Sequence, residues 1–301
     1  MISKTLRSAA QSIRRAANVV GVDVHPHSKT KWRWSYSVET YYPVDPVSRW
    51  GYGKSLHPQI TEKFERQRAE FAQLLSKLSQ SGDILASVPL EGDPHSIIPF
   101  WKNSFFGYLD GAALIAMLIR NAPARYMEIG SGNSTKFARH AIKSVGLATK
   151  IISLDPEPRA QIDALCDTSI RRRLEDCDLS LFDQLEAGDI LFFDGSHRVF
   201  TNSDVTVFFL ELMPRLKPGV IVHIHDIFLP CDYPPEWHKR MYSEQYMLAA
   251  MLLCPKSLFK VLLPNCFVCG DPELSSRVQS FLVPSGWQGG SFWIEMIKQE
   301  P

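Results

Sequence analysis

The sequence has 301 residues, 45% of them hydrophobic and 22% charged, a composition typical of a globular protein with a large buried core. Its 33 Lys and Arg residues balance 32 Asp and Glu residues, and the net charge of +1 excludes a global field that would steer the chain onto nucleic acid or anionic lipid. We therefore expect a small molecule as the partner, and no nucleic acid.

The chain carries no long apolar segment and six scattered cysteines. The longest apolar run, 111–119, is far shorter than the roughly 20 residues that a transmembrane helix needs, so a buried helix is predicted there. The cysteines, without a secretory signal, predict reduced thiols in a cytoplasmic protein. Cys266 and Cys269 form a C-x-x-C pair, but no second pair accompanies it, which favours core cysteines over a metal or redox site.

An N-terminal extension is predicted over residues 1–95, ahead of a main domain over 96–301. The first 20 residues are basic and suit a surface helix, while membrane-surface association and a transit peptide stay open as alternatives. Residues 23–60 are rich in Trp and Tyr, which fits an aromatic lid or plain packing against the core. Near-helical spacing of apolar residues predicts an amphipathic helix over 61–79, ended by Gly82 and Asp83.

From about residue 105 the pattern changes to alternating helices and short apolar strands, which is typical of an α/β fold. Two strands are almost continuously apolar, as expected when helices cover both faces of a parallel sheet. Helices are predicted at 108–121, 134–145, 158–165, 204–216 and 236–253, and strands at 125–129, 150–154, 169–174, 189–193, 220–225, 259–263 and 291–297.

The loop after the first predicted strand has the features of a ligand-binding loop. Gly130, Ser131 and Gly132 lead into a helix, so backbone N–H groups and a helix N-terminus face the carboxyl edge of the sheet. A dinucleotide fingerprint would place a third glycine where Thr135 stands, which counts against NAD.

Acidic residues near this loop indicate which ligand it binds. Glu128 would repel a pyrophosphate but can contact an ammonium group. Asp155, at the end of the second strand, can accept hydrogen bonds from both hydroxyls of a ribose, which indicates an adenosine. Glu175 or Asp176 could accept from an adenine amino group, although solvated loop acids are an equal alternative.

The segment 126–135 (YMEIGSGNST), with Asp155, 194–197 (DGSH) and 225–227 (HDI), resembles the class I S-adenosylmethionine-dependent methyltransferases. It is most similar to the bacterial branch of small-molecule O-methyltransferases, over about residues 110–246. The resemblance implies a Rossmann-like, seven-stranded, mostly parallel sheet whose reversed last strand, 291–297, lies beside the fifth. It also implies a cofactor site at Glu128, Gly130, Ser131, Gly132, Asn133, Ser134, Asp155, Asp176 and Asp194.

Candidate catalytic residues follow the fourth and fifth predicted strands, whose ends meet at the ligand edge of the sheet. In one mechanism His197 or His225, beside Asp226, acts as a general base. In the other, Asp194, His225 and Asp226 hold a divalent metal that lowers the pKa of the acceptor hydroxyl. Metal-dependent O-methyltransferases of this fold have acids at these strand ends, so His225 departs from their ligand set and could suit a softer ion or none. His223 is interpreted as structural.

The function predicted is methyl transfer from S-adenosylmethionine to a hydroxyl of a small molecule or glycoside, with residues 228–237 as a rim of the acceptor pocket. An NAD-dependent oxidoreductase and a non-catalytic cofactor-binding protein are the alternatives. The sequence leaves open the acceptor, O- versus N-methylation and whether the protein is a homo-oligomer.

Overall fold

The computed structural model describes residues 46–158, 160–279 and 289–298. Pro46–Pro301 form one compact unit, separate from Met1–Asp45. The predicted basic helix and most of the aromatic lid lie outside the described residues, and the division at residue 95 stays a prediction.

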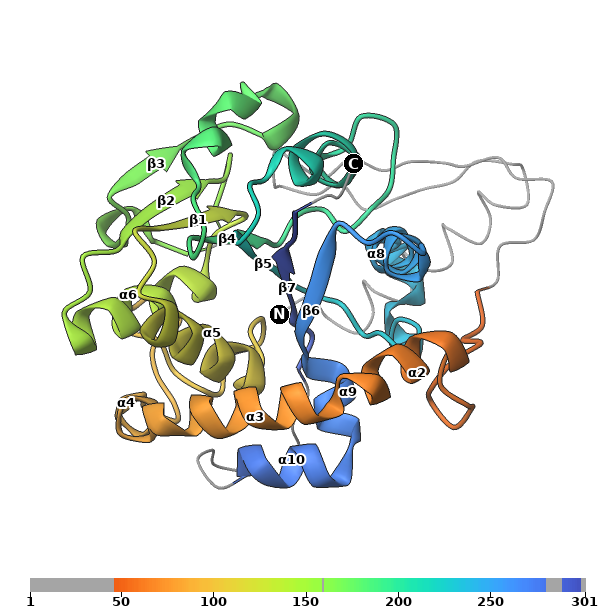
Figure 1. The fold of residues 1–301 in the computed structure, drawn as a ribbon. Coiled ribbons are helices and arrows are strands. Elements are labelled where there is room, and N and C mark those ends of the chain that lie inside the picture. Colours follow the sequence, from red (N-terminus) through yellow and green to blue (C-terminus); the bar gives the residue numbers. More distant parts are fainter. Residues whose placement is uncertain (1–45, 159, 280–288, 299–301) are drawn as a thin grey trace, which may run out of the picture. The chain divides into compact units, whose positions relative to one another are not determined.

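A seven-stranded sheet with the strand order β3-β2-β1-β4-β5-β7-β6 forms the centre of this unit (Figure 1). The strands β1 to β5 pair in parallel, whereas β7 is antiparallel to both of its neighbours, β5 and β6. The predicted Rossmann-like sheet, with its last strand beside the fifth, is therefore confirmed. The strands are β1 (Arg125–Ile129), β2 (Lys150–Leu154), β3 (Thr168–Ile170), β4 (Ile190–Phe193), β5 (Ile221–Ile224), β6 (Phe259–Pro264) and β7 (Phe292–Met296).

The helices that pack around the sheet follow the apolar pattern of the sequence. In α5 every residue from 109 to 118 is buried, which explains the long apolar run, and α5 packs against α6 (Figure 1). The described α-helices are α2 (Pro58–Arg66), α3 (Arg68–Leu78), α4 (Gly82–Ser87), α5 (Tyr108–Asn121), α6 (Asn133–Val145), α7 (Asp204–Val207), α8 (Glu244–Leu253), α9 (Asn265–Gly270) and α10 (Pro272–Gln279). None of the helices in the described ranges is long and apolar enough to cross a bilayer.

Several predicted helices differ from those observed. The helix expected over 61–79 is two helices that meet at Gln67, and Gly82 begins α4 instead of ending a helix. The helix expected over 158–165 is wrong: the described residues there form only the 3₁₀ turn Asp163–Leu165, because prolines at 156 and 158 disfavour helical backbone before them. The predicted helix 236–253 is a 3₁₀ helix, Pro235–Arg240, and then α8, since Met241 between them has a left-handed backbone with φ 56°.

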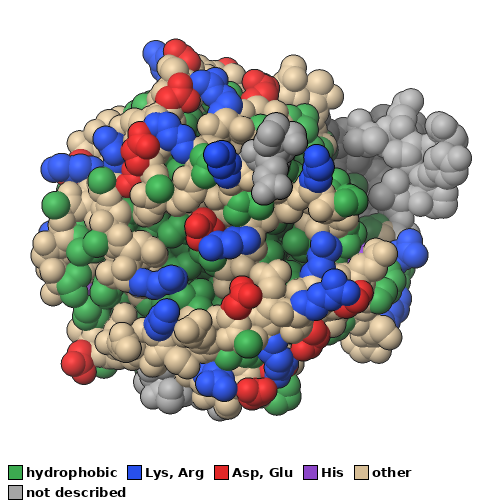
Figure 2. All heavy atoms as spheres, in the orientation of Figure 1, with side chains coloured by type: hydrophobic (Ala, Val, Ile, Leu, Met, Phe, Trp, Pro, Cys, Tyr) green, Lys and Arg blue, Asp and Glu red, His purple; other side chains and the backbone are tan. Residues whose placement is uncertain are grey.

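All six cysteines are free, and Cys266 and Cys269 lie on α9, where Cys269 packs against the core. On the face in Figure 2, Lys and Arg side chains are interspersed with Asp and Glu side chains and form no continuous basic surface.

Candidate active site

The loop between β1 and α6 lies against the end of β4. Gly130 has φ +81°, and a Cβ added there would lie 1.9 Å from the carbonyl oxygen of Asp194. Its N–H donates to the Leu154 carbonyl at 3.0 Å, so the ends of β1, β2 and β4 are joined at this glycine. Only glycine fits both the left-handed backbone and the close approach.

Asp155, at the end of β2, is fixed by the same loop. One carboxylate oxygen accepts from the Ser131 N–H and the other from the Glu157 N–H, both at 2.8 Å. The hydroxyl oxygens of Ser131 and Ser153 lie 2.7 Å apart. Each carboxylate oxygen has a second lone pair, so Asp155 could still accept the two hydroxyls of a ribose.

Glu128 is 1% exposed and lies at the centre of a hydrogen-bonded chain. It accepts from the Tyr126 hydroxyl at 2.8 Å and from the Thr135 hydroxyl at 2.5 Å. The Thr135 oxygen in turn accepts from the Gly132 N–H at 3.1 Å, which links the loop to β1. Burial raises the pKa of Glu128 to about 7, even though these hydrogen bonds oppose the rise.

The remaining cofactor residues differ in position. Asn133 begins α6 and donates to Asn103 at 3.1 Å, and Asn103 accepts from the Phe106 N–H at 2.7 Å, so a second loop is tied to the site. Ser134 is buried in the first turn of α6. Asp176 lies exposed in a 3₁₀ turn and accepts from Arg173 at 2.8 Å, so none of its hydrogen bonds in the described part of the chain joins it to the loop.

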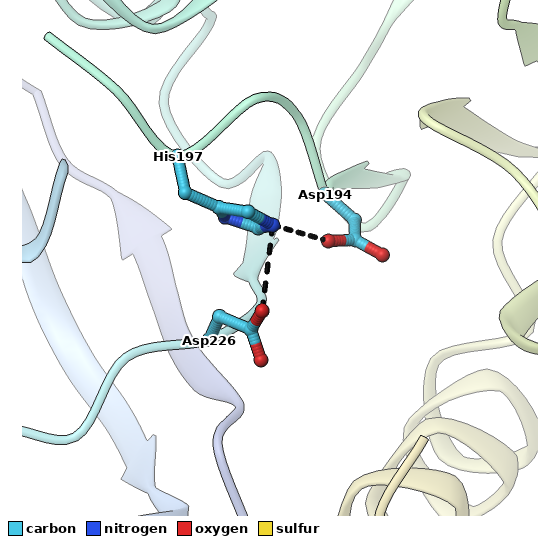
Figure 3. Close-up of side chains that lie close together, drawn as sticks. All are labelled: Asp194, His197 and Asp226. Atoms are coloured by element: carbon cyan, nitrogen blue, oxygen red, sulfur yellow. Dashed lines mark ion pairs between the residues drawn. The ribbon is translucent and has the colours of Figure 1, made fainter. Parts of the chain in front are cut away.

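Three side chains from the ends of β4 and β5 converge in Figure 3. His197 Nε2 lies 3.2 Å from Asp194 Oδ1 and 3.4 Å from Asp226 Oδ2. One ligand atom from each residue lies within 4.8 Å of the others, which is close enough to hold a metal ion. His197 and Asp226 have left-handed backbones, with φ of 61° and 58°, a strain that often accompanies functional residues.

His225 lies on the other side of the two aspartates. Its Nδ1 is 3.6 Å from Asp194 Oδ1 and 3.5 Å from Asp226 Oδ1. This Nδ1 atom is buried and makes no hydrogen bond. His223, in contrast, stacks on Trp293 with ring centroids 3.9 Å apart and lies 2.5 Å from the Ser291 hydroxyl, which agrees with a structural role.

Protonated imidazoles or a bound cation would offset the negative charge of the carboxylates in this cluster. Burial opposes charge on His197 and His225, but nearby carboxylates outweigh it and raise the pKa of both imidazoles well above 6.5. Burial also acts on Asp194, but attraction to His225 and His197 brings the pKa of this carboxyl below its usual value. The carboxylates and the unpartnered His225 nitrogen form a donor set that fits a divalent cation.

Two cluster residues that the sequence did not reveal are Glu244 and Asp110. His197 Nδ1 donates to Glu244 at 2.7 Å, and His225 Nε2 lies 3.5 Å from Asp110. Asp110 is the one charged residue in the buried stretch 109–118 of α5, a signal that could have pointed to it. Glu244 is distant in sequence and carries no such signal.

The predicted rim 228–237 contributes aromatic side chains near this cluster. The Tyr242 ring lies 4.5 Å from the His197 ring, and Trp237 lies 5.7 Å from Tyr242 and 5.2 Å from Phe228. Arg240 lies over Trp237 at 3.9 Å, a cation–π contact. Tyr242 lies outside the predicted rim but contacts both Trp237 of the rim and His197.

Comparison with known proteins identifies the class. Residues 127–227 match the family model described as "Methyltransferase domain", a segment that contains the glycine loop and the acids and histidines of both strand ends. With the sheet order above, this match confirms the resemblance to class I S-adenosylmethionine-dependent methyltransferases. Residues 127–227 are therefore a methyltransferase domain, set in a sheet that has the strand order of this class.

Solved structures of methyltransferases are similar at low identity, and no curated protein sequence matches the chain. The SAH-bound Podospora anserina methyltransferase PaMTH1 is 16% identical, over 79% of this chain and 96% of that one, with a TM-score of 0.39. A methyltransferase from Geobacter sulfurreducens is 15% identical, over 73% and 96%, with a TM-score of 0.37. MycE, from the mycinamycin biosynthetic pathway, in complex with Mg, SAH and mycinamycin VI, is 16% identical, over 74% and 54%, with a TM-score of 0.38. At these TM-scores the likeness carries no argument about the acceptor.

Proposed function

We propose that the protein transfers a methyl group from S-adenosylmethionine to a hydroxyl of a small molecule or glycoside. The observation that carries this proposal is the convergence of Asp194, His197 and Asp226 directly beside the glycine loop. A reacting hydroxyl at this point would lie next to both the cofactor and the groups that handle its proton. We also propose a cytoplasmic location, on the basis of the free cysteines.

The proposed cofactor residues each contact a different part of S-adenosylmethionine. S-adenosylmethionine supplies a methyl group on a positively charged sulfonium. Glu128 faces the ammonium of its methionine part, and Asp155 accepts from its ribose. Gly130, Ser131, Gly132, Asn133 and Ser134 present backbone at the start of α6, and the role of Asp176 toward the adenine is the least supported by contacts.

The proposed catalytic residues remove the acceptor's proton or weaken its bond to oxygen. The predicted ligand set of Asp194, His225 and Asp226 would hold a divalent ion, and His197 extends it, since its Nε2 faces the same aspartates. Such an ion supplies positive charge that lowers the pKa of a hydroxyl. Without an ion, His197 or His225 would have to act as the base, and both imidazoles are then already protonated by their carboxylate surroundings.

Calorimetric titration of chelator-treated protein with S-adenosylmethionine and with NAD⁺ tests the proposal. We expect S-adenosylmethionine alone to bind, and an Asp155→Asn variant to bind it about 10- to 100-fold more weakly, because a hydrogen bond to a charged group contributes roughly 1.5–3 kcal/mol. Labelled methyl donor should then label hydroxyl acceptors. Binding of NAD⁺ alone would support the oxidoreductase, and binding of the methyl donor without transfer would support a non-catalytic protein.

The affinity for S-adenosylmethionine is expected to rise with pH below about 7, by up to about tenfold per pH unit. Burial holds the pKa of Glu128 at about 7, so the carboxyl is mostly neutral below this pH and ionised above it. The ammonium of the ligand favours the ionised form, so binding at low pH must first remove a proton from Glu128. Titrations between about pH 6 and pH 7.5 should give a flat profile for Glu128→Gln, and a sloping profile in that variant would contradict the assignment.

A further inference from the structure

Each imidazole of the cluster has a buried carboxylate behind it. Glu244, 0% exposed, accepts from His197 Nδ1 at 2.7 Å, and Asp110, 2% exposed, lies 3.5 Å from His225 Nε2. The opposite nitrogens, His197 Nε2 and His225 Nδ1, both point to Asp194 and Asp226, at distances of 3.2 to 3.6 Å. The two rings thus have the same arrangement, with a carboxylate behind and the aspartate pair in front.

The two rear carboxylates are held in different ways. Asp110 accepts from the N–H groups of Gly290 and Ser291 at 2.9 Å and from the Asn265 amide at 2.8 Å. Glu244 is the first residue of α8, and its N–H and that of Ser243, the residue before the helix, donate to the His197 carbonyl at 3.3 and 2.8 Å. The other carboxylate oxygen of Glu244, Oε2, is buried without a hydrogen-bond partner. These contacts fix the Asp110 carboxylate behind His225 and hold the His197 backbone at the start of α8, next to Glu244.

This arrangement determines which nitrogen of each ring can donate a lone pair. A carboxylate behind one nitrogen keeps the proton there, so a neutral imidazole presents its other nitrogen without a proton. Histidines that bind metal ions usually have such a hydrogen bond on the far side. The buried Nδ1 of His225 points between two carboxylates and has no hydrogen-bond partner, which independently indicates a missing ligand.

We infer that this chain has a two-histidine, two-aspartate centre for a transition-metal ion rather than for Mg²⁺, with Glu244 and Asp110 as the positioning residues. Two imidazoles suit ions such as Fe²⁺, Co²⁺ or Zn²⁺, whereas Mg²⁺ prefers oxygen ligands and water. This inference rests on the proposed function, because it names the ion that would occupy the metal site proposed there.

Calorimetry and pulsed electron paramagnetic resonance on the metal-free full chain test this inference. We expect Co²⁺ to bind at least about a hundredfold more tightly than Mg²⁺, and bound Mn²⁺ to show hyperfine coupling to nitrogen from two imidazoles. His225→Asn places an amide oxygen near the position of Nδ1, so one nitrogen coupling should disappear and the preference for Co²⁺ over Mg²⁺ should fall about tenfold. Glu244→Gln should weaken Co²⁺ binding by about 10- to 100-fold, because a neutral amide oxygen holds the Nδ1 proton less strongly than a carboxylate does.

His140→Gln is the matched control, since His140 lies on α6, where it contacts the Ser87 hydroxyl at 2.9 Å, and should leave all metal affinities unchanged. Mg²⁺ binding as tight as Co²⁺ binding, or Mn²⁺ without nitrogen coupling, would overturn the inference. If Glu244→Gln fails to fold, the wild-type spectrum and the His225→Asn variant still test the inference.

Titration of the same preparation with S-adenosylmethionine separates the inference from the proposed function. Nitrogen-coupled Mn²⁺ in a protein that does not bind this cofactor would contradict the proposed function and still support the metal centre.

Discussion

Asp226→Asn is expected to lower kcat for methyl transfer by about 10²- to 10⁴-fold, the usual effect of losing a group that takes part in proton removal. The change removes one of two carboxylates that face both imidazoles. Asparagine keeps the size of the side chain and tolerates the left-handed backbone at φ 58°, so the fold should be retained. Single-turnover rates with labelled cofactor measure the loss.

The affinity of Asp226→Asn for S-adenosylhomocysteine should stay within about threefold of wild type, since Asp226 is proposed to act through the ion and the imidazoles on the acceptor's proton and not to bind the cofactor. Asp183→Asn is the control: this exposed carboxylate pairs with Arg215 on the surface and should have full activity. A kcat for Asp226→Asn within threefold of wild type would exclude Asp226 from the chemistry. A parallel loss of cofactor affinity would instead indicate a distorted site.

Gly130→Ala is expected to destabilise the protein by about 2–5 kcal/mol and to abolish cofactor binding. The left-handed backbone costs a non-glycine residue roughly 1–2 kcal/mol, and forcing a methyl group into occupied space costs about 1–3 kcal/mol more. The occupied space is the Asp194 carbonyl, which a Cβ would approach to 1.9 Å. Because the obstacle is backbone, relief would move the end of β4 and the metal-facing carboxylate with it. Urea denaturation measures the change in stability.

Gly132→Ala, two residues later in the same loop, provides the comparison. A Cβ there meets nothing within 4 Å, and its φ of 172° is extended backbone that any residue adopts. We expect stability within about 0.5 kcal/mol of wild type. A loss of cofactor affinity in this variant would then indicate that the ligand lies close to the backbone at position 132. Equal stability of the two variants would contradict the account given for Gly130.

Most of the strands were predictable because their apolar runs are short and bounded by proline, glycine or charge. The exception is β3, predicted over 169–174, which ends at Ile170, directly before three arginines. The predictions for 125–129 and 150–154 match β1 and β2 residue for residue. The helix predicted over 158–165 was wrong because Pro156, and Pro158 at the start of the range, disfavour helical backbone in the residues before them. The antiparallel placement of β7 came from the resemblance and not from periodicity, which carries no information on strand direction.

The site was predictable only where it follows strand ends. Asp194, His197, His225 and Asp226 were found because parallel strands bring their carboxyl ends to one edge. Glu244 and Asp110 approach from helices, 47 residues from His197 and 115 from His225, and no local pattern encodes such long-range contacts. The ligand atoms that lie within 4.8 Å of one another belong to Asp194, His197 and Asp226, whereas the sequence proposed His225 as the third ligand. Residue spacing does not indicate that the His197 ring lies closer to the two carboxylates than the His225 ring does.

The hydrogen bonds between Asp110 and the backbone at Gly290 and Ser291 join parts of the chain that are 180 and 181 residues apart. Contacts of such separation form late, because they must close a long loop before they contribute stability. On the ribosome, the glycine loop and the first five strands would be complete while the residues that hold Asp110 are still to be made. The cofactor half can therefore form early, but the chemical centre assembles only after nearly the whole chain has been synthesised.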